Sequence, residues 1–281
     1  MGLVGYGSLG QYLLKALTTD AALSAAYEVA WVWNRTPEKA AGCGAPVLAD
    51  LASFPAAGPV GLIIEVCHPA ITAAHGVAFL EHADLFLGSP TALADGELEA
   101  RLRAAAAARG RALCVPAGAL WGAADLAKMG AAGTLAALTV TMKKHPLSLQ
   151  LEKGSAPAAA LDRALASGAR GETVLYDGPV RALALAAPNN VNTMAAAALA
   201  SGAALGFDGV RALLVCDPSL LSHEVVIEAE GAPGPSGDRF TCRTVRHNPA
   251  APGAVTGSAT YASFAASLRA ARARHAGLFL C

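Results

Sequence analysis

The stretch GLVGYGSLGQYLLKAL, residues 2–17, decides the fold of the first half of the chain. A short apolar run leads into the spacing GxGxxG and then into leucines at helical intervals, which predicts a strand, a tight turn and a helix. In such a unit Gly5 permits the turn, Gly7 lets a pyrophosphate approach the backbone, and Gly10 lets helix and strand pack. The phosphates would lie at a helix N-terminus, where amides and the helix dipole favour anions. A glycine-rich structural turn is the alternative. The predicted cofactor contacts of the turn are Gly5, Gly7, Ser8, Leu9 and Gly10.

The region up to about residue 116 continues to alternate strand and helix patterns. The helix expected over residues 94–110 has Asp95 as its N-cap and Gly110 as its C-terminal stop. Alternation of this kind predicts an α/β fold with a doubly wound parallel sheet. The further strands are expected in YEVAWVW (27–33), VGLIIEVC (60–67), ADLFLGS (83–89) and RALCVPAG (111–118).

The pattern changes after residue 116. Longer runs with alternating character suit an open, antiparallel-rich sheet, with two helices between them. We therefore expect domains at 1–116, 117–256 and 257–281, the last a helix that packs back on the first domain. The strands are expected in 134–146 and 213–231, helices in 157–168, 192–206 and 256–275, and a loop or hairpin turn in 230–240.

Composition restricts the class of protein. Lys plus Arg and Asp plus Glu number 21 each, which argues against nucleic acid or an anionic membrane as a partner. No strongly apolar run is long enough for a transmembrane helix, and the first residues lack a secretory signal pattern, so we expect a cytoplasmic protein. The six cysteines are scattered without a CxxC pair, which is typical of reduced thiols and predicts neither disulfides nor a metal site.

The end of the second predicted strand bears on cofactor choice. A site for NAD usually has a carboxylate here to hold the ribose 2′-hydroxyl, but this chain has Asn34, Arg35 and Thr36. An arginine can hold a 2′-phosphate and stack on adenine. We therefore predict NADP, with use of NAD left open and a solvated arginine as the alternative.

Loops at the carboxyl ends of the later strands should line the same cofactor crevice. They offer Cys67 and His68 after the third strand and Gly88 and Ser89 after the fourth. Ala119, after the fifth, belongs to a run of small residues that lets the backbone approach a flat ring. A small core residue is the alternative for Cys67, and a helix-start histidine the alternative for His68.

The second half contains further candidates. Asn192 is a natural N-cap for the following helix, and Asn190 has an amide that could face a cleft. His223 leads into a strand and could be structural or catalytic. Lys143 and Lys144 belong to a cationic run that could be a solvated surface or could bind a dicarboxylate.

The ordered set of these motifs resembles the L-aspartate dehydrogenase family, and within it the animal aspartate dehydrogenase domain-containing proteins. The resemblance covers nearly the whole chain and rests on GYGSLG, EVCHP, GSPTALAD, AGALWGA, APNNVNTMAAAALA and NPAAPGAVTGSAT. It implies an N-terminal Rossmann domain and a C-terminal α+β domain that forms the substrate site and a homodimer interface. It also implies interconversion of L-aspartate with oxaloacetate and ammonia through iminoaspartate, with NAD or NADP.

The resemblance also assigns residue roles. It makes His223 the active-site histidine, gives cofactor contacts to Asn192, with Asn190 as second choice, and to Ala119, and maps substrate carboxylate binding onto Lys143 and Lys144. A one-residue slip on the strand would turn His223 to the opposite face of the sheet. Two other readings stay open: an imine or semialdehyde reductase acting on another small acid, and a cofactor-binding sensor without catalysis.

Overall fold

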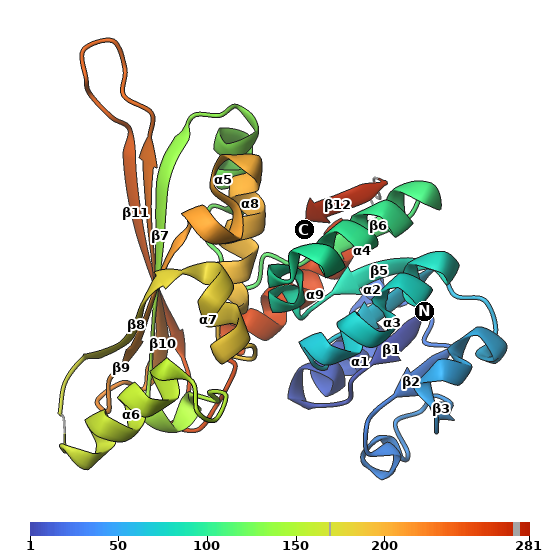
Figure 1. The fold of residues 1–281 in the computed structure, drawn as a ribbon. Helices are drawn as coiled ribbons and strands as arrows, with labels where there is room; N and C mark the ends of the chain where they lie inside the picture. The colour runs from blue at the N-terminus through green and yellow to red at the C-terminus, as the bar shows by residue number, and fades with distance from the viewer. Residues whose placement is uncertain (169, 272–275) are drawn as a thin grey trace. The chain divides into compact units, whose positions relative to one another are not determined.

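The computed structural model describes residues 1–168, 170–271 and 276–281. The chain divides into two compact units (Figure 1). Unit 1 comprises Met1–Pro116, Tyr261–Phe279 and Cys281, and unit 2 comprises Ala117–Thr260 and Leu280. Among the described residues, no helix combines the length and the apolarity that crossing a bilayer requires.

Unit 1 is built on a seven-stranded sheet in the order β12-β6-β5-β4-β1-β2-β3. The neighbours β1, β2, β3, β4, β5 and β6 pair in parallel. The chain runs outward from β1 to β3 on one side and from β4 to β6 on the other, so the strand order reverses between β1 and β4. This is the Rossmann arrangement that the sequence predicts, and in such sheets dinucleotides bind at the reversal point. The strands are β1 (Gly2–Val4), β2 (Trp31–Trp33), β3 (Val47–Leu48), β4 (Leu62–Glu65), β5 (Asp84–Leu87), β6 (Ala112–Val115) and β12 (Gly277–Leu280).

The predicted start and stop signals of helix α4 (Gly96–Ala108) are confirmed. The Asp95 side chain accepts hydrogen bonds from the amides of Glu97 and Leu98. At the other end Gly110 has a φ of +59°, and the amide of Arg111 bonds back to the carbonyl of Ala106 at 2.8 Å. The other helices of this part are α1 (Ser8–Thr19), α2 (Ala21–Ser24), α3 (Pro69–His82) and α9 (Ser258–Ala270), with short 3-10 turns η1 (Pro37–Ala40), η2 (Leu51–Ala57) and η3 (Pro90–Ala94).

The described part of the C-terminal segment packs within unit 1. The ring of Phe264 on α9 lies edge-on to Phe86 of β5, and the Tyr27 hydroxyl donates to the Leu268 carbonyl at 2.9 Å. After α9, strand β12 pairs with β6, where the amide of Cys281 donates to the carbonyl of Val115. The sequence did not predict β12, and residues 272–275 of the predicted last helix lie outside the described residues.

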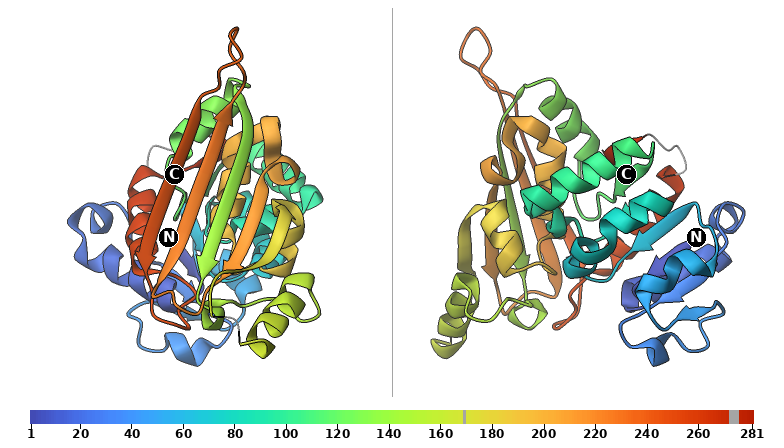
Figure 2. Two further views of the ribbon diagram at one scale, coloured as in Figure 1. Left: turned by 90° about the vertical axis from the view of Figure 1, so that its left-hand side faces the viewer. Right: turned by 45° about the vertical axis from the view of Figure 1, so that its right-hand side comes forward.

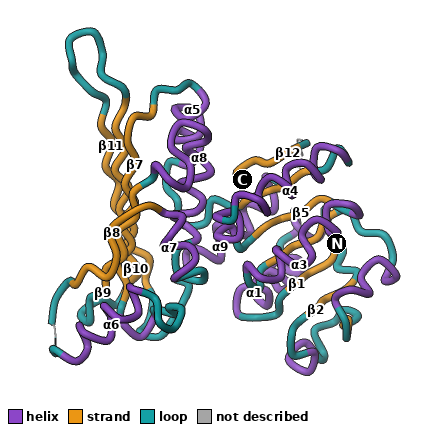
Figure 3. The backbone as a smooth tube through the Cα atoms, viewed as in Figure 1, coloured by secondary structure: helices purple, strands orange, loops and turns teal. Residues whose placement is uncertain are grey.

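Unit 2 contains a five-stranded sheet in the order β11-β10-β7-β9-β8 (Figure 3). All neighbours are antiparallel except β7 and β9. The single long strand expected over 213–231 is wrong, because Asp217 accepts from the amide and hydroxyl of Ser219 and forms a turn there. The predicted hairpin turn is confirmed, and it leads into β11, which the sequence did not reveal. The strands are β7 (Leu135–Lys144), β8 (Thr173–Pro179), β9 (Arg211–Cys216), β10 (Ser222–Gly231) and β11 (Thr241–Pro249).

One face of this sheet is covered by helices and the other is open. Helix α8 packs against β7 and against α5 and α7, and the view in Figure 2 (left) shows the opposite face uncovered. Side chains therefore alternate between a helix-covered face and an open face along each strand. The helices are α5 (Ala123–Ala131), α6 (Ala156–Ala166), α7 (Val180–Ala186) and α8 (Asn192–Gly209), with the 3-10 turn η4 (Pro146–Ser148).

Candidate functional site

The glycine turn between β1 and α1 has the geometry that its sequence predicts. Gly5 has a φ of +107°, and a Cβ there would lie 2.8 Å from the carbonyl oxygen of Val66 after β4. A Cβ on Gly10 would lie 2.1 Å from the Gly5 oxygen, whereas a Cβ on Gly7 would meet nothing within 4 Å. Gly7 is the N-cap of α1 and makes no side-chain capping bond. The turn thus leaves open space at a helix N-terminus, which fits a pyrophosphate.

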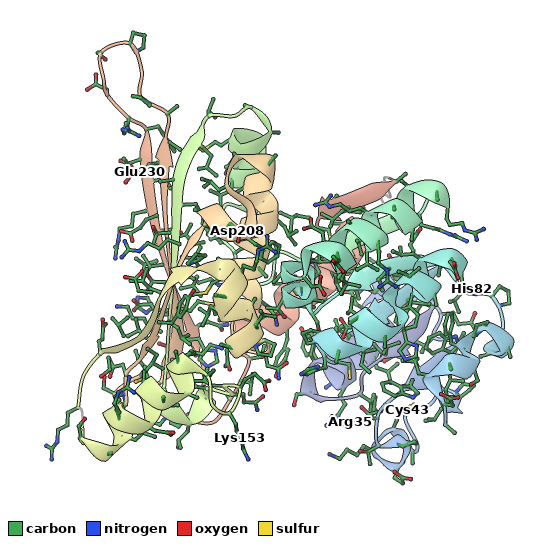
Figure 4. All side chains as sticks on the ribbon, in the orientation of Figure 1. Arg35, Cys43, His82, Lys153, Asp208 and Glu230 are labelled. Atoms are coloured by element: carbon green, nitrogen blue, oxygen red, sulfur yellow. The ribbon has the colours of Figure 1, made fainter. Side chains whose placement is uncertain are left out.

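Asn34 braces this turn from the end of β2. Its side-chain oxygen accepts from the amide of Tyr6 at 3.0 Å, and its amide donates to the carbonyl of Thr36 at 2.8 Å. The Asn34 side chain therefore shapes the turn. Arg35 and Thr36 beside it are exposed, and no ion pair engages Arg35 within the described residues. Figure 4 shows the Arg35 side chain at the periphery of unit 1, where a cation is available to an anionic group.

Glu65, at the end of β4, is a site residue that sequence reasoning missed. It is fully buried, and its carboxylate accepts from the amides of Cys67 at 2.7 Å and His68 at 2.9 Å. It also accepts from the amide of Ser89 at 3.1 Å and from its hydroxyl at 3.0 Å. Burial raises the pKa of Glu65 to about 6, although these four donors oppose the rise. A lone acidic residue inside the apolar run VGLIIEVC was the available signal, because a buried carboxylate needs partners.

The two residues after Val66 have local roles. Burial, followed by the nearby Glu65 carboxylate, raises the pKa of Cys67 to about 11, so the thiol stays protonated near neutral pH. This fits a packed residue rather than a nucleophile. His68 is the N-cap of α3, and its Nδ1 accepts from the amide of Ala70 at 3.2 Å. Gly88 is required for packing, since a Cβ there would lie 2.5 Å from the Glu65 carbonyl oxygen.

In unit 2, His223 and Lys144 come together on the helix-covered face of the sheet. Glu224 of β10 pairs with Lys143 of β7 in antiparallel register, so His223, one residue before Glu224, and Lys144, one residue after Lys143, are neighbours on the other face. Their exposed fractions are 6% for His223 and 3% for Lys144. The sequence could not establish this pairing, because it depends on the register of two distant strands.

The segment after β11 closes over this pair. The Lys144 ammonium donates to the carbonyl of Val255 at 3.2 Å, and the His223 ring is hydrogen-bonded to the backbone of Ala254. Nε2 of His223 is buried without a partner in the described structure, so the ring uses Nδ1 for that bond. Nε2 therefore carries a free lone pair. In the same described part, Lys144 has no carboxylate partner.

Burial changes the protonation of both groups. It lowers the pKa of His223 to about 4, with the Lys144 charge adding to the effect and the Ala254 bond opposing it. It lowers the pKa of Lys144 to about 7. The His223 ring is therefore neutral near pH 7, because it is desolvated beside a cation.

Lys143 and Lys144 do not form one cationic cluster. Successive residues of a strand point to opposite faces, and Lys143 lies on the open face. Its ammonium lies 2.6 Å from a carboxylate oxygen of Glu172 and 3.1 Å from one of Glu224. The carboxylate role predicted for both lysines therefore has more support at Lys144, because Lys143 is already paired with Glu172 and Glu224.

The asparagines before α8 differ from their predicted roles. Asn190 is only 2% exposed; its oxygen accepts from the amide of Gln150 at 2.7 Å and its amide donates to the Ser148 carbonyl at 2.9 Å. Its amide does not face a cleft. Asn192 is the first residue of α8 rather than its N-cap, which is Val191. Ala119 is 8% exposed and lies in unit 2.

Asn190 and its partner Ser148 support the segment over His223. The Ser148 hydroxyl accepts from the amide of Gly253 at 3.1 Å, just before the two carbonyls that hold the pair. At the far end Asn248 accepts from the amide of Ala259 at 3.0 Å. The position of the Ala254 and Val255 carbonyls is thus fixed from both sides.

Comparisons with known proteins agree with this architecture. The family description "Aspartate dehydrogenase, C-terminal" matches residues 125–267, and "Homoserine dehydrogenase, NAD binding domain" matches residues 5–116. The aspartate dehydrogenase domain-containing protein of Xenopus tropicalis is 47% identical over 100% of this chain and 97% of its own length. The L-aspartate dehydrogenase of Ruegeria pomeroyi is 38% identical over 57% of this chain and 55% of its own. The solved aspartate dehydrogenase of Thermotoga maritima shares the fold at 17% identity, with a TM-score of 0.68 over 96% of this chain and 94% of its own.

Proposed function

Because this chain belongs to the aspartate dehydrogenase family, we propose that it interconverts L-aspartate with oxaloacetate and ammonia through iminoaspartate. The chain is an NAD(P)-dependent oxidoreductase, and the choice of substrate is the proposed part. The observation that carries the substrate assignment is the buried pair of His223 and Lys144. A base with a free lone pair beside an unpaired cation suits proton transfer on an anionic substrate.

Lys144 is proposed to bind a carboxylate of the substrate. Its ammonium is buried, has one hydrogen bond to a carbonyl and lacks an acidic partner in the described part of the chain. A carboxylate beside it would favour the charged form and would make charge-assisted hydrogen bonds. Lys143, which the resemblance also suggested, has no part in this proposal because it pairs with Glu172 and Glu224.

His223 is proposed to move the proton. Its low pKa keeps the ring neutral near pH 7, so Nε2 is an acceptor. During oxidation of aspartate, Nε2 takes a proton from the water that adds to the imine carbon of iminoaspartate. Nε2 then gives this proton to the amino group of the carbinolamine, which leaves as ammonia, and takes up the hydroxyl proton as the carbonyl of oxaloacetate forms. During amination these steps run in reverse, and the same nitrogen returns the proton to the hydroxyl group, which leaves as water.

The cofactor is proposed to lie on the glycine turn, with its pyrophosphate over Gly7 and Arg35 holding the 2′-phosphate of NADP. When bound, the nicotinamide supplies or accepts the hydride at the substrate α-carbon. The open space at Gly7 and the exposed guanidinium of Arg35 support this arrangement. The remaining proposed contacts are Gly5, Ser8, Leu9, Gly10, Thr36, His68, Gly88, Ser89, Ala119 and Asn192.

The homodimer is proposed to form through the open face of the unit 2 sheet. That face carries Val174 and Val245, which are 55% and 42% exposed, among charges of both signs such as Arg243 and Glu228. A two-fold axis brings identical patches together, so mixed charges can pair with their copies. Sedimentation should give a dimer, and Val245→Arg should shift it toward the monomer. The cytoplasmic location stays a prediction.

The test of the reaction is oxidation of NADPH, and separately of NADH, with oxaloacetate and ammonium. Ammonium-dependent oxidation supports the proposal, and omitting ammonium controls for plain reduction of the ketone. His223→Ala should lower turnover by roughly 10²–10⁴-fold and leave cofactor affinity unchanged. Turnover on other 2-oxo acids but not on oxaloacetate would favour a reductase of another small acid. Cofactor binding without turnover on any of them would favour a sensor.

A further inference from the structure

We infer that Glu65 is a positioning residue that makes cofactor binding depend on pH, because its carboxylate accepts all four of its hydrogen bonds from the loops after β4 and β5 only while it is ionised. This inference rests on NAD(P) binding at the glycine turn and not on the aspartate reaction.

The Glu65 carboxylate joins two loops that follow neighbouring strands. The amides of Cys67 and His68 come from the loop after β4, and the amide and hydroxyl of Ser89 come from the loop after β5. The side chain has no exposed surface, and no basic partner lies within ion-pairing distance among residues 1–168, 170–271 and 276–281. Ionisation is therefore supported by hydrogen bonds alone.

All four partners of the carboxylate are donors in this arrangement. Oε1 accepts from Cys67, His68 and the Ser89 hydroxyl, and Oε2 accepts from the Ser89 amide. A proton on Oε2 would face the N–H of Ser89, and two donors cannot share a hydrogen bond. Protonation therefore removes the bond from the Ser89 amide, whereas the backbone bond from the Gly88 amide to the Glu65 carbonyl, at 2.7 Å, remains.

These loops lie directly against the glycine turn. A Cβ on Gly5 would be 2.8 Å from the Val66 oxygen, and a Cβ on Gly88 would be 2.8 Å from Cγ1 of Val66. Val66 thus lies in close contact with both the turn and the loop after β5. In a Rossmann sheet the cofactor occupies this reversal point, so a shift of Ser89 in the loop after β5 weakens the site that receives it.

The titratable groups around Glu65 are few. Burial places the pKa of Glu65 at about 6, within reach of ordinary buffers. The Cys67 thiol, with a pKa of about 11, does not titrate in that range. The positive charge of Arg35 lowers the pKa of Cys67, but burial and the Glu65 carboxylate, which raise it, have the larger effects. The His68 ring caps α3 through Nδ1 and is the one neighbour that requires a separate control.

Binding of NAD⁺ measured by calorimetry tests the inference. NAD⁺ is chosen because the 2′-phosphate of NADP titrates near pH 6 itself, whereas a pyrophosphate diester keeps its charge. We assume that only protein with an ionised Glu65 binds NAD⁺. At pH 5, one unit below a pKa of about 6, roughly one molecule in ten is ionised, so the affinity for NAD⁺ should be about tenfold weaker than at pH 7.5. Glu65→Gln mimics the protonated acid, because its amide faces Ser89. It should bind weakly and equally at both pH values.

Two further variants test whether Glu65, rather than His68, is the group whose protonation changes the affinity. His68→Asn keeps an N-cap side chain and should retain the tenfold change, whatever its absolute affinity. Ser89→Ala removes one donor to the carboxylate, so the midpoint of the change should move to higher pH. The inference is overturned if the wild type binds NAD⁺ equally at pH 5 and 7.5. It is overturned as well if Glu65→Gln keeps the change or His68→Asn loses it. If Glu65→Gln fails to fold, the wild type and Ser89→Ala still decide. No substrate is present, so failure of the aspartate reaction would not affect the outcome.

Discussion

Replacing Lys144 by methionine should stabilise the protein while it removes the proposed substrate contact. Burial lowers the Lys144 pKa from 10.5 to about 7, so keeping the ammonium charged in the folded state is unfavourable. The sign follows from this shift. Lys144 contributes nothing above its unfolded pKa, near 10.5, where both states are neutral, and it destabilises the folded state increasingly as pH falls from there toward 7.

A shift of one pKa unit between the unfolded and folded states corresponds to about 1.4 kcal/mol of folding free energy. The unfavourable free energy is about 4 kcal/mol at pH 7 and about 2 kcal/mol at pH 9, because unfolded lysine binds a proton at both while folded Lys144 releases it. Methionine preserves most of the packed stem and loses one hydrogen bond, to Val255, worth about 1 kcal/mol. Lys144→Met should therefore gain about 3 kcal/mol at pH 7 and about 1 kcal/mol at pH 9.

Urea unfolding at the two pH values measures this difference. Other groups that titrate between pH 7 and 9 are common to both proteins, so the difference isolates Lys144. Lys143→Met is the matched control: ion pairs with Glu172 and Glu224 raise the Lys143 pKa, so its pH dependence should equal that of the wild type. A Lys144→Met protein that is less stable than the wild type at pH 7, or that follows the same pH dependence, would contradict a destabilising Lys144 charge.

Three other changes test separate parts of the site. Gly7→Val should abolish NADPH binding with an unchanged melting temperature, because its Cβ enters open space at the turn; retained binding in a fluorescence titration would contradict this role. Arg35→Ala should weaken the binding of NADPH by about 10- to 100-fold, because a charged hydrogen bond contributes about 1.5–3 kcal/mol, and should leave the binding of NADH unchanged. An equal loss of affinity for both cofactors would argue against a 2′-phosphate contact. Asn190→Ala should lower the free energy of unfolding by about 2 kcal/mol or more, since it leaves buried partners unsatisfied. Asn189, the preceding residue, is partly exposed, so Asn189→Ala should change the free energy little in the same urea assay; equal effects would contradict the bracing role.

Sequence reasoning succeeded where structure is set locally. The glycine spacing, the leucines of α1 and the capping signals of α4 all act within a few residues, so pattern alone predicted them. It failed at the boundary between β9 and β10, where Asp217 and Pro218 were the overlooked turn signal.

The site was less predictable than the fold because it depends on register. Lys143 and Lys144 look like one cluster in sequence, yet the two-residue period of a strand places them on opposite faces. The neutral state of His223 depends on burial and on a lysine from another strand, which no local pattern records. Glu65 is visible in the sequence as the one acidic residue of an apolar run, but its hydrogen-bond partners come from two loops, which the sequence does not reveal.

The return of the chain to unit 1 after unit 2 has a consequence for biosynthesis. Strand β6 lies between β5 and β12, so until β12 has been synthesised β6 is an edge strand with unpaired backbone groups on one side. The ring of Phe264 and the bond from Tyr27 to Leu268 are likewise absent until residues 264 and 268 have been synthesised. The nucleotide-binding half therefore begins to form first on the ribosome but is completed last, after unit 2 has had time to fold. A truncated chain ending before residue 261 should expose this edge and aggregate.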